Sequence, residues 1–488
     1  MPTTARLLLA CLILAALATG LALAQEAQTP FQKGLALHEQ KDLPGALEQF
    51  LGALQAQPRD PVILAWCGTV ALELGRLPEA IKYLDAATKE DPKSKVYFNN
   101  LGNAYAANGQ KDKAEAAYRT ALFLDPNYFD AHFNLANLKA AQEDWATAFN
   151  EYSRAILANP NDVDAHLNFG YALRKAGERD KAIREYQTAA RLQPERVETL
   201  MSLGSLLLEA KRDIEAVETY RGLLAKTPDK AEALLGLGTG LYNLGKHEEA
   251  IGALQAAATA LPQSFEAQYN LALAQTALKN YPAAEESYAR ALELRPNNAN
   301  CLNNLGALQF EQGQYKEAAD TFQKAIQVNP QLELAYLNRA RALARAGEKE
   351  SALQVWLTIT RLFPNSEAGH LGLADVYYDQ GDKDHALQEY LAVVRISPAN
   401  AAAQNNAGLI YLGRDKLAEA TGCFQTALTA DPRFVPALNN LGVVYQKQGN
   451  LEKAKAQYLK ALNVDPTYEP AKKNLEQLST PMTSRAPA

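Results

Sequence analysis

Asparagine recurs along the chain at an interval of 34 residues, with breaks at Ser202, Gly236 and Gly372, and its side chain is the first candidate for chemistry in this sequence. The column contains eight residues: Asn100, Asn134, Asn168, Asn270, Asn304, Asn338, Asn406 and Asn440. A side-chain amide offers a donor and an acceptor, which match a polypeptide backbone unit without reading its side chains. The alternative is a purely structural role for the column. The sequence leaves both interpretations open.

A small polar and aromatic cluster is the second candidate for ligand binding. Tyr171, Arg174 and Lys175 lie close together within one such interval. At the positions equivalent to Arg174 and Lys175 in the adjacent intervals, the only acid is Glu209. We therefore expect these three residues to anchor an acidic or aromatic ligand.

Two further arginines have acids at the equivalent positions of the next interval. Asp375 follows Arg341 by one interval, and Asp379 follows Arg345 by the same spacing. This arrangement predicts two ion pairs between adjacent intervals. Partly exposed pairs of this kind contribute only about 0–1 kcal/mol each.

Catalytic and metal-binding patterns do not emerge from the sequence. His132 and His166 are also one interval apart, but no third ligand accompanies them, so we interpret them as packing residues. No glycine-rich phosphate loop, CxxC pair or nucleophile elbow is present. The net charge of −6 and the lack of a long basic run argue against nucleic acid as a partner. We expect a non-enzymatic protein without a cofactor.

The element that must position these residues is a repeat of constant length, equal to the asparagine interval. Proline follows the same period without a slip, at positions 58, 92, 126, 160, 194, 228, 262, 296, 330, 364, 398, 432 and 466. With those prolines at position 32 of each unit, thirteen repeats run from Ala27 to Tyr468, and position 20 is alanine in every one of them. Such strict self-similarity is the signature of a repeat architecture.

The third repeat shows what each unit contains. Val96–Ala107 and Asp112–Leu124 are predicted helices, separated by a turn at Asn108-Gly109 and followed by Pro126. The eighth position is always Gly or Ala, because two helices in a hairpin need small residues where they cross. A large side chain at position 24, Tyr118 in this repeat, fills the space beside the crossing.

These columns resemble the tetratricopeptide repeat family over Ala27–Tyr468. The resemblance implies an all-α fold, a right-handed α–α superhelix whose first helices line a concave groove. It places the asparagine column on the groove wall, in a pattern similar to the repeat region of O-linked N-acetylglucosamine transferases, without their catalytic domain. The implied function is an interaction scaffold that binds a protein or an extended peptide in the groove. The alternative is a structural component of an envelope or exopolysaccharide secretion assembly, associated with membrane-bound machinery.

The two ends of the chain differ from the repeats. Residues 469–478 read as a polar C-terminal capping helix, which a solenoid needs over its last apolar edge, and residues 479–488 as a disordered tail. At the other end, residues 1–24 combine one early positive charge with an apolar stretch that closes with Ala22-Leu23-Ala24. This pattern predicts a signal peptide and an exported, periplasmic protein. The alternative is an uncleaved N-terminal membrane anchor.

The cleavage site provides a first test. Because the small-x-small pattern ends at Ala24, the exported chain is expected to begin at Gln25. N-terminal sequencing of the native protein checks this, and a sequence starting at Met1 or Pro2 would favour the membrane anchor.

Overall fold

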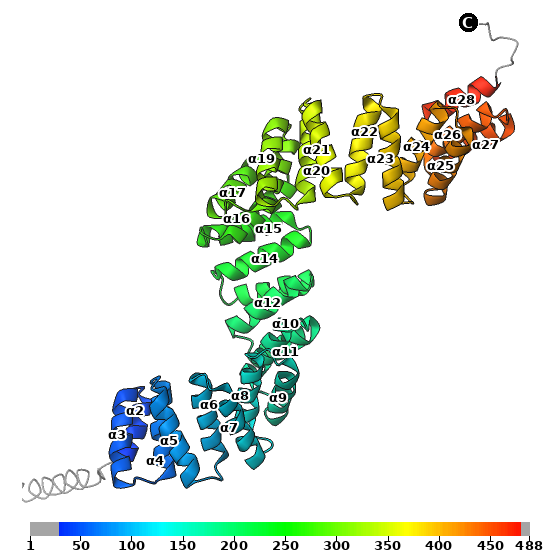
Figure 1. The fold of residues 1–488 in the computed structure, drawn as a ribbon. Helices are drawn as coiled ribbons and strands as arrows, with labels where there is room; N and C mark the ends of the chain where they lie inside the picture. Colours follow the sequence, from blue (N-terminus) through cyan, green and yellow to red (C-terminus); the bar gives the residue numbers. More distant parts are fainter. Residues whose placement is uncertain (1–28, 480–488) are drawn as a thin grey trace, which may run out of the picture. The chain divides into compact units, whose positions relative to one another are not determined.

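A computed structural model describes residues 29–479, which form 27 α-helices and no strand (Figure 1). The helices fall into two compact units, one ending at Leu244 and the other beginning at Gly245. The predicted signal segment and all of the predicted tail beyond residue 479 lie outside the described residues. No helix in residues 29–479 combines the length and apolar character that a membrane crossing requires.

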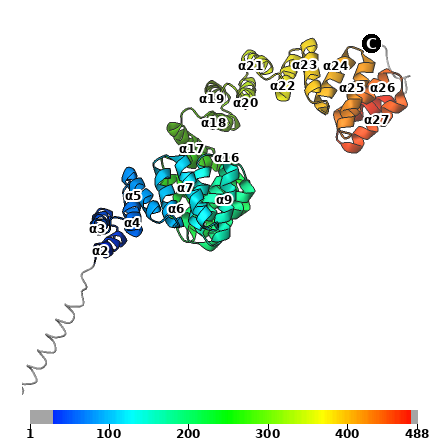
Figure 2. The same cartoon turned by 60° about the horizontal axis from the view of Figure 1, so that its bottom comes forward.

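Within each unit the helices succeed one another as hairpins, from α2 with α3 to α12 with α13 in the first unit and from α16 with α17 to α26 with α27 in the second, and each of these hairpins is one repeat (Figures 1 and 2). The first unit contains α2 (Pro30–Glu39), α3 (Leu43–Ala56), α4 (Pro61–Glu73), α5 (Leu77–Glu90), α6 (Lys95–Ala107), α7 (Lys111–Leu124), α8 (Phe129–Ala140), α9 (Trp145–Ala158), α10 (Val163–Lys175), α11 (Arg179–Leu192), α12 (Val197–Glu209), α13 (Asp213–Leu224) and α14 (Ala231–Asn243). The second contains α15 (His247–Ala260), α16 (Phe265–Ala277), α17 (Tyr281–Leu294), α18 (Ala299–Glu311), α19 (Tyr315–Val328), α20 (Glu333–Arg345), α21 (Lys349–Leu362), α22 (Glu367–Asp379), α23 (Lys383–Ile396), α24 (Ala401–Gly413), α25 (Leu417–Ala430), α26 (Val435–Lys447), α27 (Leu451–Val464) and α28 (Glu469–Ser479). The all-α repeat fold predicted from the sequence is confirmed.

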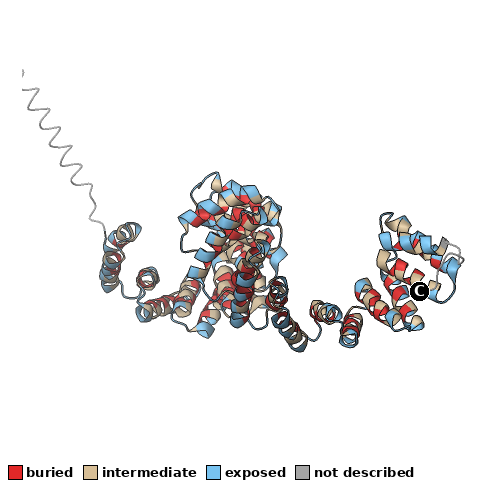
Figure 3. Ribbon diagram, turned by 90° about the horizontal axis from the view of Figure 1, so that it is seen from above, coloured by how far each residue is buried: buried red, intermediate tan, exposed pale blue. Residues whose placement is uncertain are grey.

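The crossing of the two helices in each hairpin is as close as the small residues indicated. A Cβ atom added to Gly102 in α6 would lie 2.5 Å from the ring of Tyr118 in α7, which is itself 2% exposed. Ala114, the alanine at position 20, is fully buried beside them. Figure 3 shows buried residues along the helix faces that meet their neighbours. The core is therefore a succession of clusters along the helices, one of which runs from Leu302 of α18 to Leu373 of α22.

The turn within each hairpin depends on one residue in the left-handed backbone region. A positive φ occurs once per repeat, always at position 15, so the described residues contain thirteen such turns. Glycine occupies eight of them, as Gly109 does with a φ of 73°. Five repeats place another residue there: Lys41, Glu143, Lys211, Lys279 and Asp415. This conformation costs a non-glycine residue about 1–2 kcal/mol.

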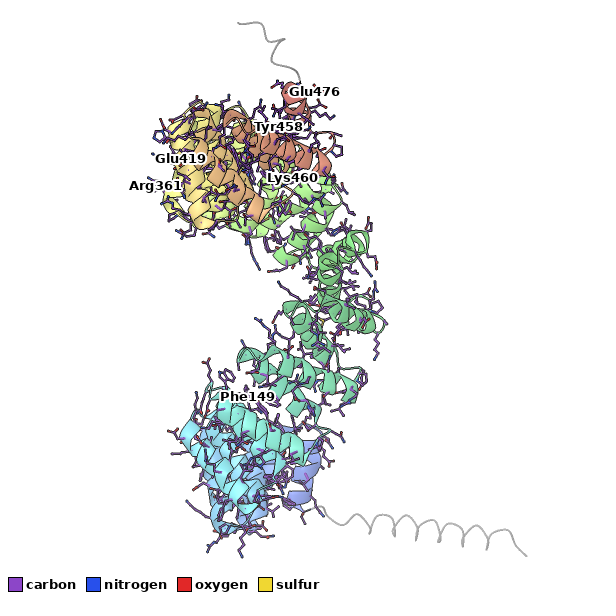
Figure 4. The ribbon with its side chains drawn as sticks, turned by 90° about the vertical axis from the view of Figure 1, so that its right-hand side faces the viewer. Phe149, Arg361, Glu419, Tyr458, Lys460 and Glu476 are labelled. Atoms are coloured by element: carbon purple, nitrogen blue, oxygen red, sulfur yellow. The ribbon has the colours of Figure 1, made fainter. Side chains whose placement is uncertain are left out.

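The last helix covers the end of the second unit. Ala471 of α28 is buried, and Leu475 and Leu478 pack against a cluster that includes Tyr458 of α27. Figure 4 marks Tyr458 and, on the exposed side of α28, Glu476. An amphipathic helix in this place shields the apolar edge that a further repeat would otherwise cover.

The left-handed turns predict a stabilising substitution. Lys279→Gly relieves the backbone strain at φ 58°, so unfolding is expected to require about 1 kcal/mol more. The matched control is Lys324→Gly, an exposed position inside α19, where glycine costs about 1 kcal/mol of helix propensity. Thermal unfolding of both variants checks the opposite signs, and a lower melting temperature for Lys279→Gly would contradict the argument.

Candidate functional site

The first helices form the inner wall of each unit. In the first unit α4 contacts α6, α6 contacts α8, α8 contacts α10 and α12 contacts α14, and in the second α18 contacts α20, α24 contacts α26 and α26 contacts α28. Successive second helices make no comparable contacts in the described residues. First helices therefore converge and second helices diverge. This places the asparagine column, all of it on first helices, along the inner wall.

The asparagine column connects each repeat to the one before it. All eight side chains are half-buried. Six of them donate a hydrogen bond from Nδ2 to the preceding repeat: Asn100 to Thr69 at 3.3 Å, Asn134 to Asn99 at 3.0 Å, Asn168 to Asn137 at 3.1 Å, Asn304 to Tyr269 at 2.8 Å, Asn338 to Asn303 at 3.1 Å and Asn440 to Asn405 at 2.9 Å. The other two, Asn270 and Asn406, also have partners within the protein.

The asparagines nearest the C-terminus form a continuous chain of amides. Asn474 of α28 donates to Asn439, which donates to Asn440 in the same helix. Asn440 donates to Asn405 of α24, and Asn405 donates to Asn406. Hydrogen bonds in such a chain polarise and strengthen one another. Here the donor of Asn440 is used between repeats, and its acceptor is used within its own helix.

These hydrogen bonds support a structural role for the Nδ2 groups of the asparagine column. Each of these six asparagines uses one Nδ2 hydrogen and still has a second. In several of them, such as Asn338, the side-chain oxygen accepts no hydrogen bond from the described residues. Ligand binding by these remaining groups stays a prediction. The partners were not predictable from the asparagine column alone, because they lie at positions 5 and 9 of the preceding repeat, where the residue type varies.

The Tyr171 cluster is only partly available to a ligand. Arg174 donates to Glu209 of the next repeat and also reaches Ser205 Oγ at 3.4 Å, so its charge is paired. Lys175 is exposed, forms no ion pair with residues 29–479, and its ammonium lies 5.6 Å from the centre of the Tyr171 ring. Tyr171 itself is 57% exposed. Tyr171 and Lys175 remain as the accessible part of the predicted anchor.

The two predicted ion pairs of the tenth and eleventh repeats are wrong. Arg345 turns toward the preceding repeat, where its guanidinium lies 5.2 Å from the Tyr315 ring centre and donates to the Tyr315 hydroxyl at 3.1 Å. Asp375 accepts a hydrogen bond from Tyr390 at 2.7 Å, and burial raises the pKa of its carboxyl. Neither Arg341–Asp375 nor Arg345–Asp379 occurs among the ion pairs of residues 29–479. An aromatic neighbour and a buried acceptor provide the competing contacts.

The cysteine and histidine side chains that could be reactive are buried or already hydrogen-bonded within the protein. Burial raises the pKa of the Cys67 and Cys301 thiols to about 12, which leaves them protonated at neutral pH. His132 and His166 each contact a glutamate and a backbone carbonyl. Within residues 29–479 no group of three potential metal ligands comes together.

The amide chain predicts a loss of stability when it is interrupted. Asn440→Ala removes the bond to Asn405 and the acceptor of Asn439, which are 4% and 5% exposed. Leaving buried amide groups unpaired costs about 1–3 kcal/mol, so the melting temperature of the variant should fall. Asn463→Ala, an exposed position in α27, is the control and should be nearly neutral. Equal melting temperatures for the two variants would show that the amide chain carries no stability.

Comparison with known proteins gives the family. Three models described as tetratricopeptide repeat match the chain, the first over residues 31–95, 68–129, 99–163, 133–178, 167–231, 215–265, 303–367 and 337–401, the second over 263–331 and the third over 435–468. No curated protein matches the chain in sequence.

Solved structures are similar at low sequence identity. Yeast Tom70 is 17% identical, with a TM-score of 0.38 over 86% of this chain and 95% of that chain. YrrB, described as a TPR protein with an unusual peptide-binding site, is 20% identical, with a TM-score of 0.35 over 39% and 99%. MamA is 26% identical, with a TM-score of 0.33 over 34% and 92%. With family matches over most of its length and paired helices throughout the described residues, the chain belongs to the tetratricopeptide repeat family.

Proposed function

We propose that this protein is an exported scaffold that binds an extended polypeptide, or an extended segment of a partner protein, along the inner wall of its repeats. Membership of the tetratricopeptide repeat family supports the coarser statement, a protein–protein interaction scaffold. This fold is typically non-catalytic. The location of the asparagine column and of α10 on the inner wall supports the more specific proposal, binding of an extended polypeptide along that wall.

Energetics require side-chain anchors in addition to the amides. Rungs on adjacent helices lie about 10 Å apart, against a strand rise of about 3.3 Å, so each rung serves about three bound residues. A net hydrogen bond contributes about 0.5–1.5 kcal/mol, whereas ordering three residues costs about 3–6 kcal/mol. The asparagines can set the direction and register of a ligand. Affinity must come from other contacts or from a ligand that is already extended.

Tyr171 is the observation on which the binding proposal depends most. It is a large aromatic side chain, 57% exposed on a first helix, with a cation over its ring. Partly exposed tyrosines of this kind supply much of the energy of protein interfaces when a partner buries them. Lys175 adds a preference for an acidic residue beside the aromatic contact, since Arg174 is already paired with Glu209.

Export is the second part of the proposal and depends on residues 1–24. Their composition favours a cleaved signal and a periplasmic location, with an N-terminal anchor as the alternative. The alternative function, a structural part of an envelope or exopolysaccharide secretion assembly, shares this location. The two functions differ in whether the partner is bound reversibly.

Site-specific crosslinking tests the proposed binding face. A photoreactive residue at Tyr171 should label a partner polypeptide in envelope extract, and excess unlabelled chain should compete for the labelling. The control is the same residue at Gln187, an exposed position on α11 of the same repeat. Tyr171→Ala with Lys175→Ala should weaken binding of the captured partner about tenfold, the effect of losing about 1.4 kcal/mol at a hot spot.

The outcomes separate the hypotheses. Labelling at Gln187 alone, or at both positions without competition, would overturn binding on the inner wall. A labelled partner that stays in fixed stoichiometry with the chain through purification would favour the structural assembly.

A further inference from the structure

Three repeats share a pair of titratable residues that the other repeats lack. Histidine occupies position 4 in the fourth, fifth and eleventh repeats, as His132, His166 and His370. Glutamate occupies position 23 in the same three repeats and in no other of the thirteen: Glu151, Glu185 and Glu389. Positions 4 and 23, which belong to different helices of the repeat, thus change together within a single chain. Residues that vary as a pair indicate a direct and specific contact.

The structure brings each pair together in the same way. Histidine Nδ1 lies 2.5 Å from Glu151 Oε2 in the fourth repeat, 2.7 Å from Glu185 Oε2 in the fifth and 2.5 Å from Glu389 Oε2 in the eleventh. Nε2 of the same rings lies 2.9, 3.0 and 3.1 Å from the carbonyl oxygens of Pro126, Pro160 and Pro364, respectively. These prolines belong to the position-32 column, so each ring connects a first helix to its own second helix and to the corner that precedes it.

The number of protons in this arrangement is determined by the acceptors. A neutral imidazole has one donor and one acceptor nitrogen, yet both nitrogens face oxygen atoms, a carboxylate and a carbonyl. Both contacts are hydrogen bonds only if the pair holds an extra proton, either on the ring or shared with the carboxyl. The pair therefore titrates as one unit. Without that proton, one ring nitrogen directs its lone pair at an oxygen.

The surroundings of His166 favour retention of the proton. His132 and His166 are 2% and 5% exposed, which limits access of water to a broken contact. Around His166 the charged groups are Glu185 of α11 and Asp162 before α10, both acidic. The hydrogen bond to Glu185 raises the pKa of His166, against the opposing effect of burial. Around His132 they are Glu151 of α9 and Asp125 of the preceding corner, which is paired with Lys95.

Other repeats show how the same junction is built without a titratable group. Gln404, at position 4 of the twelfth repeat, donates to the Pro398 carbonyl at 3.5 Å with no charge involved. The sixth and ninth repeats place Leu at position 4 and Thr at position 23, as in Leu200 with Thr219. A histidine is therefore not required by the fold at this position.

We propose that the three His–Glu pairs are proton-dependent clamps, each of which fastens a first helix to the preceding repeat corner when it holds its proton and loosens that junction when the proton leaves. The device acts at the start of α8, α10 and α22 and nowhere else among these position-4 residues. It is independent of whether the inner wall binds a polypeptide.

The sign of the pH dependence follows for the fifth repeat. Because the pKa of His166 is raised in the folded chain, its stabilisation is complete below the unfolded pKa of about 6.5. It is lost as the pH rises through the folded pKa. Each pKa unit between the folded and unfolded states appears as a tenfold change in the equilibrium for opening of the clamped segment.

Hydrogen exchange of the full chain tests the clamp. Protection of α10, after correction for intrinsic exchange rates, should be greater at pH 5.5 than at pH 9. The double variant His166→Leu with Glu185→Thr installs the residues of the sixth repeat and should abolish this difference in α10. The contacts of His132 with Glu151 and Pro126 are intact in that variant, so protection of α8 should match that of the native chain at each pH. An unchanged pH dependence of α10 in the double variant would overturn the proposal.

A second measurement keeps the test decisive if the double variant folds poorly. Glu185→Gln preserves the shape of the partner and removes its charge, so the NMR titration of the His166 ring should move to lower pH. The ring signals of His132 should be the same in this variant as in the native chain. A His166 ring that is neutral at pH 5.5 in the native chain, or that titrates identically with Gln at 185, would contradict a shared proton.

Discussion

The close crossing of the two helices in each hairpin constrains most of the rest of the structure. At Gly102 there is no room for a Cβ atom, which would lie 2.5 Å from Tyr118, and at Gly442 the same distance separates it from Tyr458. In these two repeats the aromatic ring fills the space at the crossing, which restricts how the two helices can pack. Residues on the first helix then have fixed directions, those beside the small position facing the inner wall.

The aromatic core and the inner wall are connected through polar atoms. The hydroxyl of Tyr152 reaches from the core to Asn137 Oδ1 at 2.5 Å, and the same oxygen accepts from Asn168 of the next repeat. One amide thus joins the packing within a repeat to the contact between repeats. Since the wall asparagines are committed in this way, a ligand must gain most of its energy from side chains that project beyond them, as Tyr171 does.

Structural features set by residues that recur in every repeat were predictable from the sequence. Features that depend on which side chain a neighbouring repeat supplies were not. The helices of the third repeat, Lys95–Ala107 and Lys111–Leu124, agree with prediction to within one residue at each end, because glycine and proline mark the turns. The turn at Lys279 carries no such mark, since its left-handed conformation is imposed by the hairpin and not by the residue. The predicted ion pair of Arg345 was wrong because Arg345 has neighbours in both adjacent repeats. Its guanidinium contacts Tyr315 of the preceding repeat and not the acid of the next one. The contacts of His132 and His166 with glutamates could have been predicted from the sequence. That prediction requires a search for repeat positions whose residue types vary together, whereas the constant positions give no indication of it.

In a repeat array, each contact acts mainly on its own junction. Stability is approximately a sum of terms for single repeats and for neighbouring interfaces, so the presence or absence of one proton changes one term and leaves distant repeats unaffected. His166 and Tyr171 lie on the same helix, α10, with the clamp at its first turns and the exposed ring farther along. If a partner requires an ordered α10, protonation of the clamp increases its affinity, and by linkage the bound partner increases the proton affinity of the clamp by the same factor. The same coupling cannot arise at the sixth repeat, because Leu200 and Thr219 have no proton to exchange.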